Sequence, residues 1–154
     1  MRIRRAGAHD LVVVGRMRLA FLADHRGVDA ASFTAEFAAR TRRFVEQRQH
    51  AGNLSSWLAE DGGRCVGVVS MLLVDMPPRP DDPRTRDGYV LNLYVEPAHR
   101  GRGIGRELFE ACIGSAPGTG LRRIFLHATD AGRPLYEEAG FRPNDDWMEL
   151  RLDP

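Results

Sequence analysis

The sequence predicts an α/β fold in which one mixed β-sheet carries helices on both faces. Segments rich in β-branched and aromatic residues recur between segments with helical periodicity, and glycine or proline lies at many of the boundaries. The 154 residues suffice for a single domain, residues 1–154, with its own core. A hydrophobic fraction of 43% and a charged fraction of 28% are typical of a soluble globular protein.

The first half of the chain is predicted to form two helices between its first strand and the next two. In chain order these elements are a strand at 2–6, a helix from His9 or Asp10 to about His25, a helix capped near Ser32, and strands at 54–60 and 64–74 joined by a Gly62-Gly63 hairpin turn. The second of these strands has apolar residues at both alternating sets of positions, which predicts burial on both faces.

The second half begins with a proline-rich surface loop at 75–87, whose acids Asp81, Asp82 and Asp87 are expected to be solvated. The predicted elements that follow are a strand at 89–95, a helix at 103–115, a strand at 122–127, a short helix at 132–139, and two last strands, from Phe141 and at 148–152. The full predicted order is β-α-α-β-β-β-α-β-α-β-β.

A glycine-rich turn between the strand at 89–95 and the following helix is the main functional signal. Gly101, Gly103 and Gly105 each cost roughly 0.5–1 kcal/mol of backbone order relative to alanine. This cost is offset if bare backbone N–H groups at a helix start bind an anion. Arg100, Arg102 and Arg106 add cationic side chains to the same turn. We therefore expect a diphosphate site.

Two common diphosphate motifs do not match this turn. A Walker loop needs a lysine, and all 22 basic residues of this chain are arginine, a bias typical of a high-GC bacterial genome. A dinucleotide fingerprint needs a third glycine where Arg106 stands. The pattern Arg100-x-x-Gly103-x-Gly105 instead resembles motif A of the GCN5-related N-acetyltransferases (GNAT).

A second motif extends the resemblance over essentially the whole chain. Leu135-Tyr136-x-x-x-Gly140-Phe141 is similar to motif B of that family. The resemblance implies the acyl-CoA N-acyltransferase fold, with two central parallel strands that splay apart to admit acetyl-CoA as cosubstrate. One departure is Thr129, which stands where the family often has an asparagine that contacts the pantetheine arm.

The resemblance also assigns the site residues. Strand-like backbone contacts to the pantetheine arm would come from Leu93 and Val95, and a backbone N–H near Val95 would polarise the thioester carbonyl. The full set of expected cofactor-binding residues is Leu93, Tyr94, Val95, Arg100, Gly101, Arg102, Gly103, Ile104, Gly105, Arg106, Thr129 and Tyr136.

Acetyl transfer to an amine requires two proton movements. Only about one part in a thousand of a primary amine with pKa near 10.4 is neutral at pH 7, so a base has to remove a proton before attack. By resemblance, Tyr136 is the acid that protonates the departing thiolate. Asn92 cannot act as a base, and we expect it to position a water on the strand beside the acetyl group. The base stays open among Glu60, Asp75, His127 and water alone.

We therefore expect an acetyl-CoA-dependent N-acetyltransferase that acts on a small-molecule or protein amine by direct attack in a ternary complex. The alternative is a CoA- or acyl-CoA-binding regulatory module of the same fold without turnover. A net charge of +1 without a basic block argues against a nucleic-acid partner. The histidines and the two cysteines lack metal-ligand spacing, so no metal is expected.

Location, assembly and acceptor are less constrained by the sequence. No apolar run is long enough for a membrane span and no signal peptide is recognisable, so we expect a cytoplasmic protein without a membrane partner. Many relatives dimerise, so a homodimer is an open alternative. The acceptor pocket of this fold would be built by residues 24–31, 75–87 and 142–146, which carry no motif. The identity of the acceptor and the use of acyl groups other than acetyl stay open.

Overall fold

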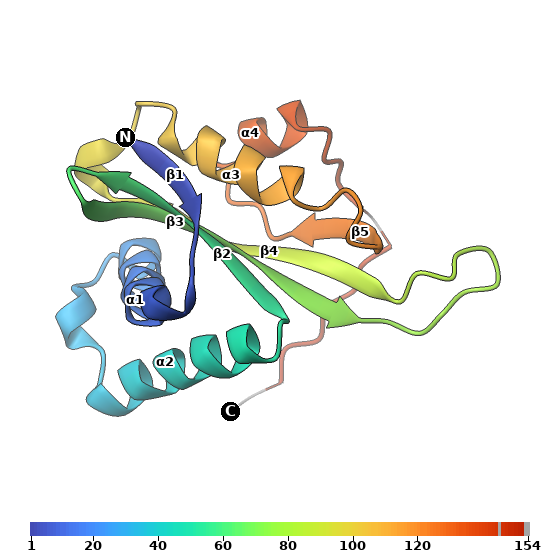
Figure 1. The fold of residues 1–154 in the computed structure, drawn as a ribbon, viewed down its shortest axis with the longest axis horizontal. Helices are drawn as coiled ribbons and strands as arrows, with labels where there is room; N and C mark the ends of the chain where they lie inside the picture. The colour runs from blue at the N-terminus through green and yellow to red at the C-terminus, as the bar shows by residue number, and fades with distance from the viewer. Residues whose placement is uncertain (145, 153–154) are drawn as a thin grey trace.

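The computed structural model describes residues 1–144 and 146–152, and these form one five-stranded mixed sheet (Figure 1). The strands are β1 (Arg2–Arg5), β2 (Leu54–Asp61), β3 (Arg64–Asp75), β4 (Arg86–Val95) and β5 (Leu121–Leu126), in this order across the sheet. Neighbours from β1 to β4 are antiparallel, whereas β4 and β5 are parallel. The predicted α/β class with a mixed sheet is confirmed.

Helices cover both faces of this sheet, as predicted (Figure 1). The helices of the described residues are α1 (Leu11–Arg26), α2 (Ala35–His50), α3 (Ile104–Gly114) and α4 (Arg133–Glu138), with 3₁₀ turns η1 (Ala8–Asp10), η2 (Ala30–Ser32) and η3 (Pro97–His99). The pair α1 and α2 lies on one face, and the pair α3 and α4 lies on the other. No helix of the described residues is both long and apolar enough to cross a membrane.

Each face of the sheet has its own hydrophobic core. Leu108 and Phe109 of α3 pack with Val66 and Val69 on one side, and Val14 of α1 packs with Val68 and other β3 residues on the opposite side. Strand β3 is therefore buried on both faces, as its sequence predicted. The next strand, β4, contributes Val90 to the first core and Tyr94 to the second.

The neighbouring strands β4 and β5 are paired along only part of their length. Their register runs from Arg86 opposite Leu121 to Val90 opposite Leu126, and the remainder of β4 has no β5 partner. Just beyond this point the β3–β4 register shifts, and Asn92 adopts a left-handed φ of 59°. A bulge of this kind re-aims a side chain and bends the strand. The backbone edge of β4 is thus freed where a ligand could enter between the two strands.

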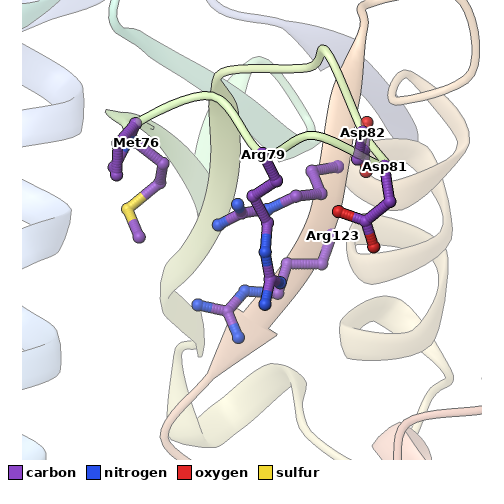
Figure 2. A pocket seen from close by; sticks show the side chains of 7 residues that line it. Met76, Arg79, Asp81, Asp82 and Arg123 are labelled. Atoms are coloured by element: carbon purple, nitrogen blue, oxygen red, sulfur yellow. The ribbon is translucent and has the colours of Figure 1, made fainter.

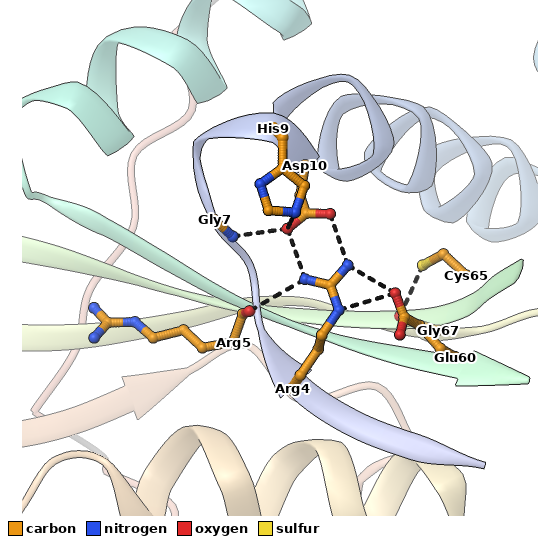
Figure 3. A network of polar contacts seen from close by, with 8 residues as sticks. All are labelled: Arg4, Arg5, Gly7, His9, Asp10, Glu60, Cys65 and Gly67. Atoms are coloured by element: carbon orange, nitrogen blue, oxygen red, sulfur yellow. Dashed lines mark hydrogen bonds and ion pairs between the residues drawn. The ribbon is translucent and has the colours of Figure 1, made fainter. Parts of the chain in front are cut away.

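The N-terminal strand is fixed by a network around Arg4 (Figure 3). The Arg4 guanidinium donates to both carboxylate oxygens of Asp10, at 2.7 and 2.8 Å, and to Glu60 at 2.7 Å. Asp10 also accepts from the backbone N–H of Gly7 at 2.7 Å. The network joins β1, β2 and the start of α1.

The prediction of two C-terminal strands is wrong for the described residues. The chain from Phe141 to Asn144 and from Asp146 to Leu152 forms no strand. The apolar alternation that predicted a strand is present, but Met148, Leu150 and Leu152 are 96%, 84% and 83% exposed. A strand also needs a hydrogen-bonded partner, and this segment has none among the described residues.

Three smaller expectations also change. Helix α2 is capped by Thr34, which accepts from the N–H of Phe37, whereas Ser32 lies in η2. Strand β4 begins three residues before the predicted start. Asp87, expected to be solvated, is fully buried because Arg122 and Arg123 both donate to its carboxylate, at 2.8 to 3.2 Å. These two arginines hold the pKa of Asp87 below its usual value against the opposing effect of burial.

Candidate active site

A pocket lies where the chain leaves β4 and enters α3. Its volume is about 240 Å³, and its lining residues are Leu93, Val95, His99, Arg100, Gly101, Gly103, Ile104, Gly105 and Arg106. Most of these are residues that the sequence assigned to the cofactor. The glycine-rich turn therefore forms a concave site beside the freed edge of β4.

The backbone of this turn is suited to bind an anion. Within the described residues, none of the N–H groups from Gly101 to Arg106 donates a hydrogen bond to a protein atom. Gly101 and Gly103 have φ values of 75° and 79°, a conformation that favours glycine. The N-terminus of α3 adds the positive end of its dipole. These unpaired donors fit the diphosphate of CoA.

The arginines of the turn differ in their availability. Arg100 donates to Asp24 at 2.7 Å and to the carbonyl of Val95 at 2.9 Å. Arg106 is paired with Glu138. Arg102 is exposed and forms no ion pair with a described residue. All three arginines add positive charge to the turn, and Arg102 is the one that is not paired with a described residue.

The side chains of β4 are distributed over both faces of the sheet. Leu93 and Val95 pack against the α3 core, whereas Tyr94 is buried in the α1 core beneath the guanidinium of Arg100. The N–H of Glu96 donates to Val66 of β3 at 2.9 Å. Tyr94 can thus contribute to a ligand on the α3 face only through its backbone.

Thr129 lies in the connection before α4. Its side-chain oxygen accepts from the N–H of Gly132 at 3.2 Å, and its carbonyl accepts from Gly132 and Arg133 at 3.0 Å. The hydroxyl thus stabilises the start of α4 and retains its own proton for donation.

Tyr136 projects from α4 into an aromatic cluster. Its ring centroid lies 5.1 Å from that of Phe109 and 6.3 Å from that of Phe141. Its hydroxyl has no hydrogen-bond partner in the described part of the chain. Burial raises the pKa of Tyr136, so the phenol keeps its proton at neutral pH. Such a hydroxyl is available to donate to a ligand atom.

Asn92 and Arg18 meet on the opposite, α1 side of the sheet. Asn92 is only 6% exposed, and its side-chain oxygen accepts from the Arg18 guanidinium. Arg18 also lies over the ring of Phe21, at 5.6 Å. The residue predicted to position a water thus presents its amide beside a partly buried cation.

Two of the three base candidates lie away from the strand gap. Glu60 is held by Arg4, which lowers the pKa of its carboxyl and makes it a weaker base. Asp75 pairs with Arg86 at 3.1 Å, at the end of the β3–β4 ladder opposite the bulge.

His127 directly follows β5, where its pairing with β4 ends. Its Nδ1 atom lies 2.9 Å from the hydroxyl of Tyr89, so one tautomer leaves Nε2 free to accept a proton. Tyr89 stacks on Phe125, and Phe125 stacks on Trp147, with centroids 5.0 and 5.7 Å apart. Among the candidate bases, His127 alone lies beside the gap.

A second, larger pocket of about 410 Å³ lies at the opposite end of β4 (Figure 2). It is lined by Met76, Pro77, Arg79, Asp81, Asp82, Arg122 and Arg123. Asp82 is neutralised by Arg84 at 2.7 Å, and Arg122 and Arg123 are engaged by Asp87. Its charges are mixed and largely paired, which argues against a strong anion site.

Three residues near the site were not singled out from the sequence: Arg18, Asp24 and Tyr89. Arg18 follows Met17 and precedes Phe21 by three positions, at the edge of the apolar stripe of α1. A cation in that place is a signal that could have been used. Asp24 and Tyr89 depend on partners 76 and 38 residues away, which no local pattern specifies.

The known sequences to which this chain is similar are described as acetyltransferases. The family described as "Acetyltransferase (GNAT) family" matches residues 19–141. Glucosamine 6-phosphate N-acetyltransferase of Trypanosoma brucei brucei is 26% identical over 109 residues, which cover 70% of this chain and 72% of that protein. N-acetyltransferase family 8 member 2 of Rattus norvegicus is 28% identical over 129 residues, which cover 82% of this chain but only 53% of that protein.

Solved structures agree with these sequence matches. A predicted acetyltransferase with acetyl-CoA from Clostridium acetobutylicum superimposes with a TM-score of 0.85 and 27% identity, covering 98% of this chain and 96% of that one. A GCN5-related N-acetyltransferase from Ralstonia eutropha JMP134 gives a TM-score of 0.80 and 32% identity, covering 97% of both chains.

Proposed function

Since this chain belongs to the GNAT family of acetyltransferases, we propose that it transfers the acetyl group of acetyl-CoA to a primary amine by direct attack within a ternary complex. The chain is an acyltransferase, and acetyl-CoA is its cosubstrate. The direct mechanism and the roles of individual residues are the proposal. The observation that carries it is the set of unpaired N–H groups around the pocket at the end of β4.

Two features of the chain position the cosubstrate. Backbone N–H groups from Gly101 to Arg106 bind the diphosphate, and the unpaired edge of β4 near Leu93 and Val95 binds the pantetheine arm. When bound, acetyl-CoA supplies an activated acetyl group as a thioester. The chain itself then has to orient the acceptor amine, remove a proton from it and stabilise the departing thiolate.

His127 is the group we assign to the first proton movement. It lies beside the gap between β4 and β5, and Tyr89 orients its ring through Nδ1. The free Nε2 accepts a proton from the ammonium form of the acceptor, directly or through a water held by Asn92. The neutral amine nitrogen then attacks the acetyl carbon while the bond from that carbon to sulfur breaks, and the new amide nitrogen loses its second proton to water.

Tyr136 acts on the departing sulfur by donating a hydrogen bond, and not by the full proton transfer that the resemblance implied. Proton transfer from a phenol near pKa 10 to a thiolate near 8.5 is uphill by about 1.5 pKa units, and burial of Tyr136 widens this gap. The hydroxyl therefore lowers the barrier by stabilising the developing negative charge as the bond breaks. The displaced thiolate is finally protonated from solvent.

Thiol release from acetyl-CoA in the presence of a panel of primary amines tests the proposal. At least one amine should release thiol, and Tyr136→Phe should reduce kcat by about 100-fold or more. The same variant should keep the increase in melting temperature that CoA produces. Tight CoA binding without turnover of any amine would instead favour a CoA-binding regulatory module.

The protein's own thiols will not disturb this measurement. Cys65 and Cys112 are both buried, and burial raises the pKa of the Cys112 thiol to about 12. A buried thiol of this kind reacts slowly with thiol reagents. Signal from the reagent therefore reports CoA.

For the acceptor, we propose a chemical class and not an individual compound. A similar protein is described as acting on glucosamine 6-phosphate, an amino sugar, which is consistent with a small-molecule amine. We keep small-molecule and protein amines as the acceptor class, and the amine panel should contain both. Solution mass measurement should accompany it to test for the homodimer.

A further inference from the structure

Among the partly buried arginines, Arg18 is unusual because no carboxylate in the part of the chain that the structure describes neutralises it. Arg122 is buried against Asp87, and Arg4 is buried against Asp10 and Glu60. Arg18 has a comparable setting on α1, yet it forms no ion pair with any carboxylate of residues 1–144 or 146–152. Burial lowers the pKa of its guanidinium, and no carboxylate of the described residues opposes this effect.

The neighbours that Arg18 does have are neutral. One N–H donates to the amide oxygen of Asn92, and the guanidinium lies over the ring of Phe21. These contacts orient the group but do not compensate its charge. A partly buried cation without a counter-ion destabilises a fold. A ligand that supplies the missing negative charge would recover this free energy when it binds.

Arg18 also lies at the strand gap, on the face opposite Tyr136. Asn92 is the bulge residue just beyond the last β4–β5 pair, and the hydroxyl of Tyr89 lies within electrostatic range of Arg18. His127 contacts Tyr89 on that side. An amine that reached the gap from the α1 face would therefore pass Arg18 and His127 together. The diphosphate turn lies further along the chain, beyond the end of β4, where Arg100 and Arg102 stand.

We propose that Arg18 binds an oxyanion of the acceptor, a carboxylate or a phosphate carried on the same molecule as the reacting amine. This inference rests on the proposed acetyl transfer and narrows its substrate class to anionic amines. The planar guanidinium is suited to such groups because its parallel N–H donors match two oxygens. The bond to Asn92 fixes the orientation of that fork before the acceptor arrives.

Matched acceptor pairs test the inference. One pair sets an amino acid against its amide, and another sets an amino sugar phosphate against the parent amino sugar, so that carboxylate and phosphate are distinguished. Wild-type protein should have a kcat/KM about 10- to 100-fold higher for the anionic member of at least one pair. In Arg18→Gln this preference should disappear because kcat/KM falls for the anionic acceptor, whereas kcat/KM for its neutral partner stays unchanged.

Three controls separate recognition from folding. Arg16→Gln removes an exposed arginine from the same helix and should leave the preference unchanged. Arg18→Lys keeps the positive charge and should retain part of it. The anionic acceptor should raise the melting temperature of wild-type protein in the presence of CoA but not that of Arg18→Gln, while CoA alone should stabilise both.

The outcomes distinguish this inference from the function on which it rests. If wild-type protein acetylates neutral and anionic partners equally, or if Arg18→Gln slows both members of a pair by the same factor, Arg18 is structural and the inference is wrong, although the chain is still an N-acetyltransferase. If no amine of either kind releases thiol, the proposed function fails and the inference falls with it.

Discussion

Asp24, near the end of α1, accepts a 2.7 Å hydrogen bond from the guanidinium of Arg100, 76 residues later in the turn after β4. The same guanidinium donates to the carbonyl of Val95. Helix α1, which carries Arg18 on the acceptor side, is thereby tied to the turn that we assign to the diphosphate. The ion pair also places a carboxylate close to that anion site.

Removing this carboxylate should strengthen CoA binding. In Asp24→Asn, one negative charge near the diphosphate is lost and Arg100 is released, so we expect about two- to fivefold tighter binding by calorimetry at low salt. Because the pair is exposed, the free energy of unfolding should fall by about 1 kcal/mol or less. Glu46→Gln, which removes a carboxylate from α2, is the control. Weaker CoA binding in Asp24→Asn would mean that the pair serves to position the turn.

A second prediction follows from the left-handed conformation of Gly103. A valine there would be strained at a φ of 79° by about 1–2 kcal/mol and would cover the N–H groups of the pocket. Gly103→Val should therefore stay folded but lose the increase in melting temperature that CoA produces. Gly118→Val is a matched control, because Gly118 has a φ of 82° but lies outside the pocket. Full protection of Gly103→Val by CoA would exclude the proposed diphosphate site.

The order of most elements and the place of the cofactor pocket could be predicted from the sequence because their signals are local. Hydrophobic periodicity located α1, β3 and α3, and Gly62 and Gly63 marked the hairpin with φ values of 56° and 78°. The glycines of the cofactor turn similarly indicated a left-handed backbone conformation, since few other residues adopt a positive φ. These features depend on neighbours within a few positions.

Features that depend on distant partners could not be predicted. The sequence around Asp87 predicts a solvated loop, and only the fold brings Arg122 and Arg123 to its carboxylate. Apolar and polar side chains alternate over residues 148–152 as they do in a strand. This alternation does not show whether a neighbouring strand is available to form backbone hydrogen bonds. The place of Arg18 beside the apolar stripe of α1 is a local signal, but its contact with Asn92 spans 74 residues and has none.

Gly132 makes a third prediction, because it leaves room for the ring of Tyr136. A Cβ atom at Gly132 would lie 2.9 to 3.1 Å from three atoms of the Tyr136 side chain, two of the ring and the hydroxyl oxygen. The φ of Gly132 is −88°, so alanine causes no backbone strain, and the ring would have to move instead. Gly132→Ala should lower kcat about tenfold or more with little change in CoA affinity.

A matched alanine separates this effect from general helix stabilisation. Gly114 ends α3, and a Cβ atom there has no neighbour within 4 Å. Gly114→Ala should leave kcat unchanged. If Gly132→Ala were as active as wild type, the position of the Tyr136 hydroxyl would not matter for turnover, and its assignment as the donor to sulfur would be wrong.

Asp10 makes the fourth prediction, on stability at low pH. Hydrogen bonds from Arg4 lower the pKa of Asp10 from 3.8 to about 2 in the folded chain, against the opposing effect of burial. A carboxyl whose pKa is lower in the folded state binds fewer protons there, so it stabilises the fold above the unfolded pKa and ceases to do so as the pH falls to about 2. This contribution is roughly 2 kcal/mol at neutral pH.

Urea unfolding of the wild type and of Asp10→Asn between pH 7 and pH 2 measures this contribution. The variant should be less stable by roughly 2 kcal/mol at pH 7, and the difference should shrink between about pH 4 and pH 2. Asp82→Asn provides the control, since Asp82 pairs with Arg84 in an exposed loop, where an ion pair adds little stability. A difference between wild type and Asp10→Asn that stays constant down to pH 2 would mean that Asp10 stabilises the start of α1 through its bond to Gly7, independently of its charge.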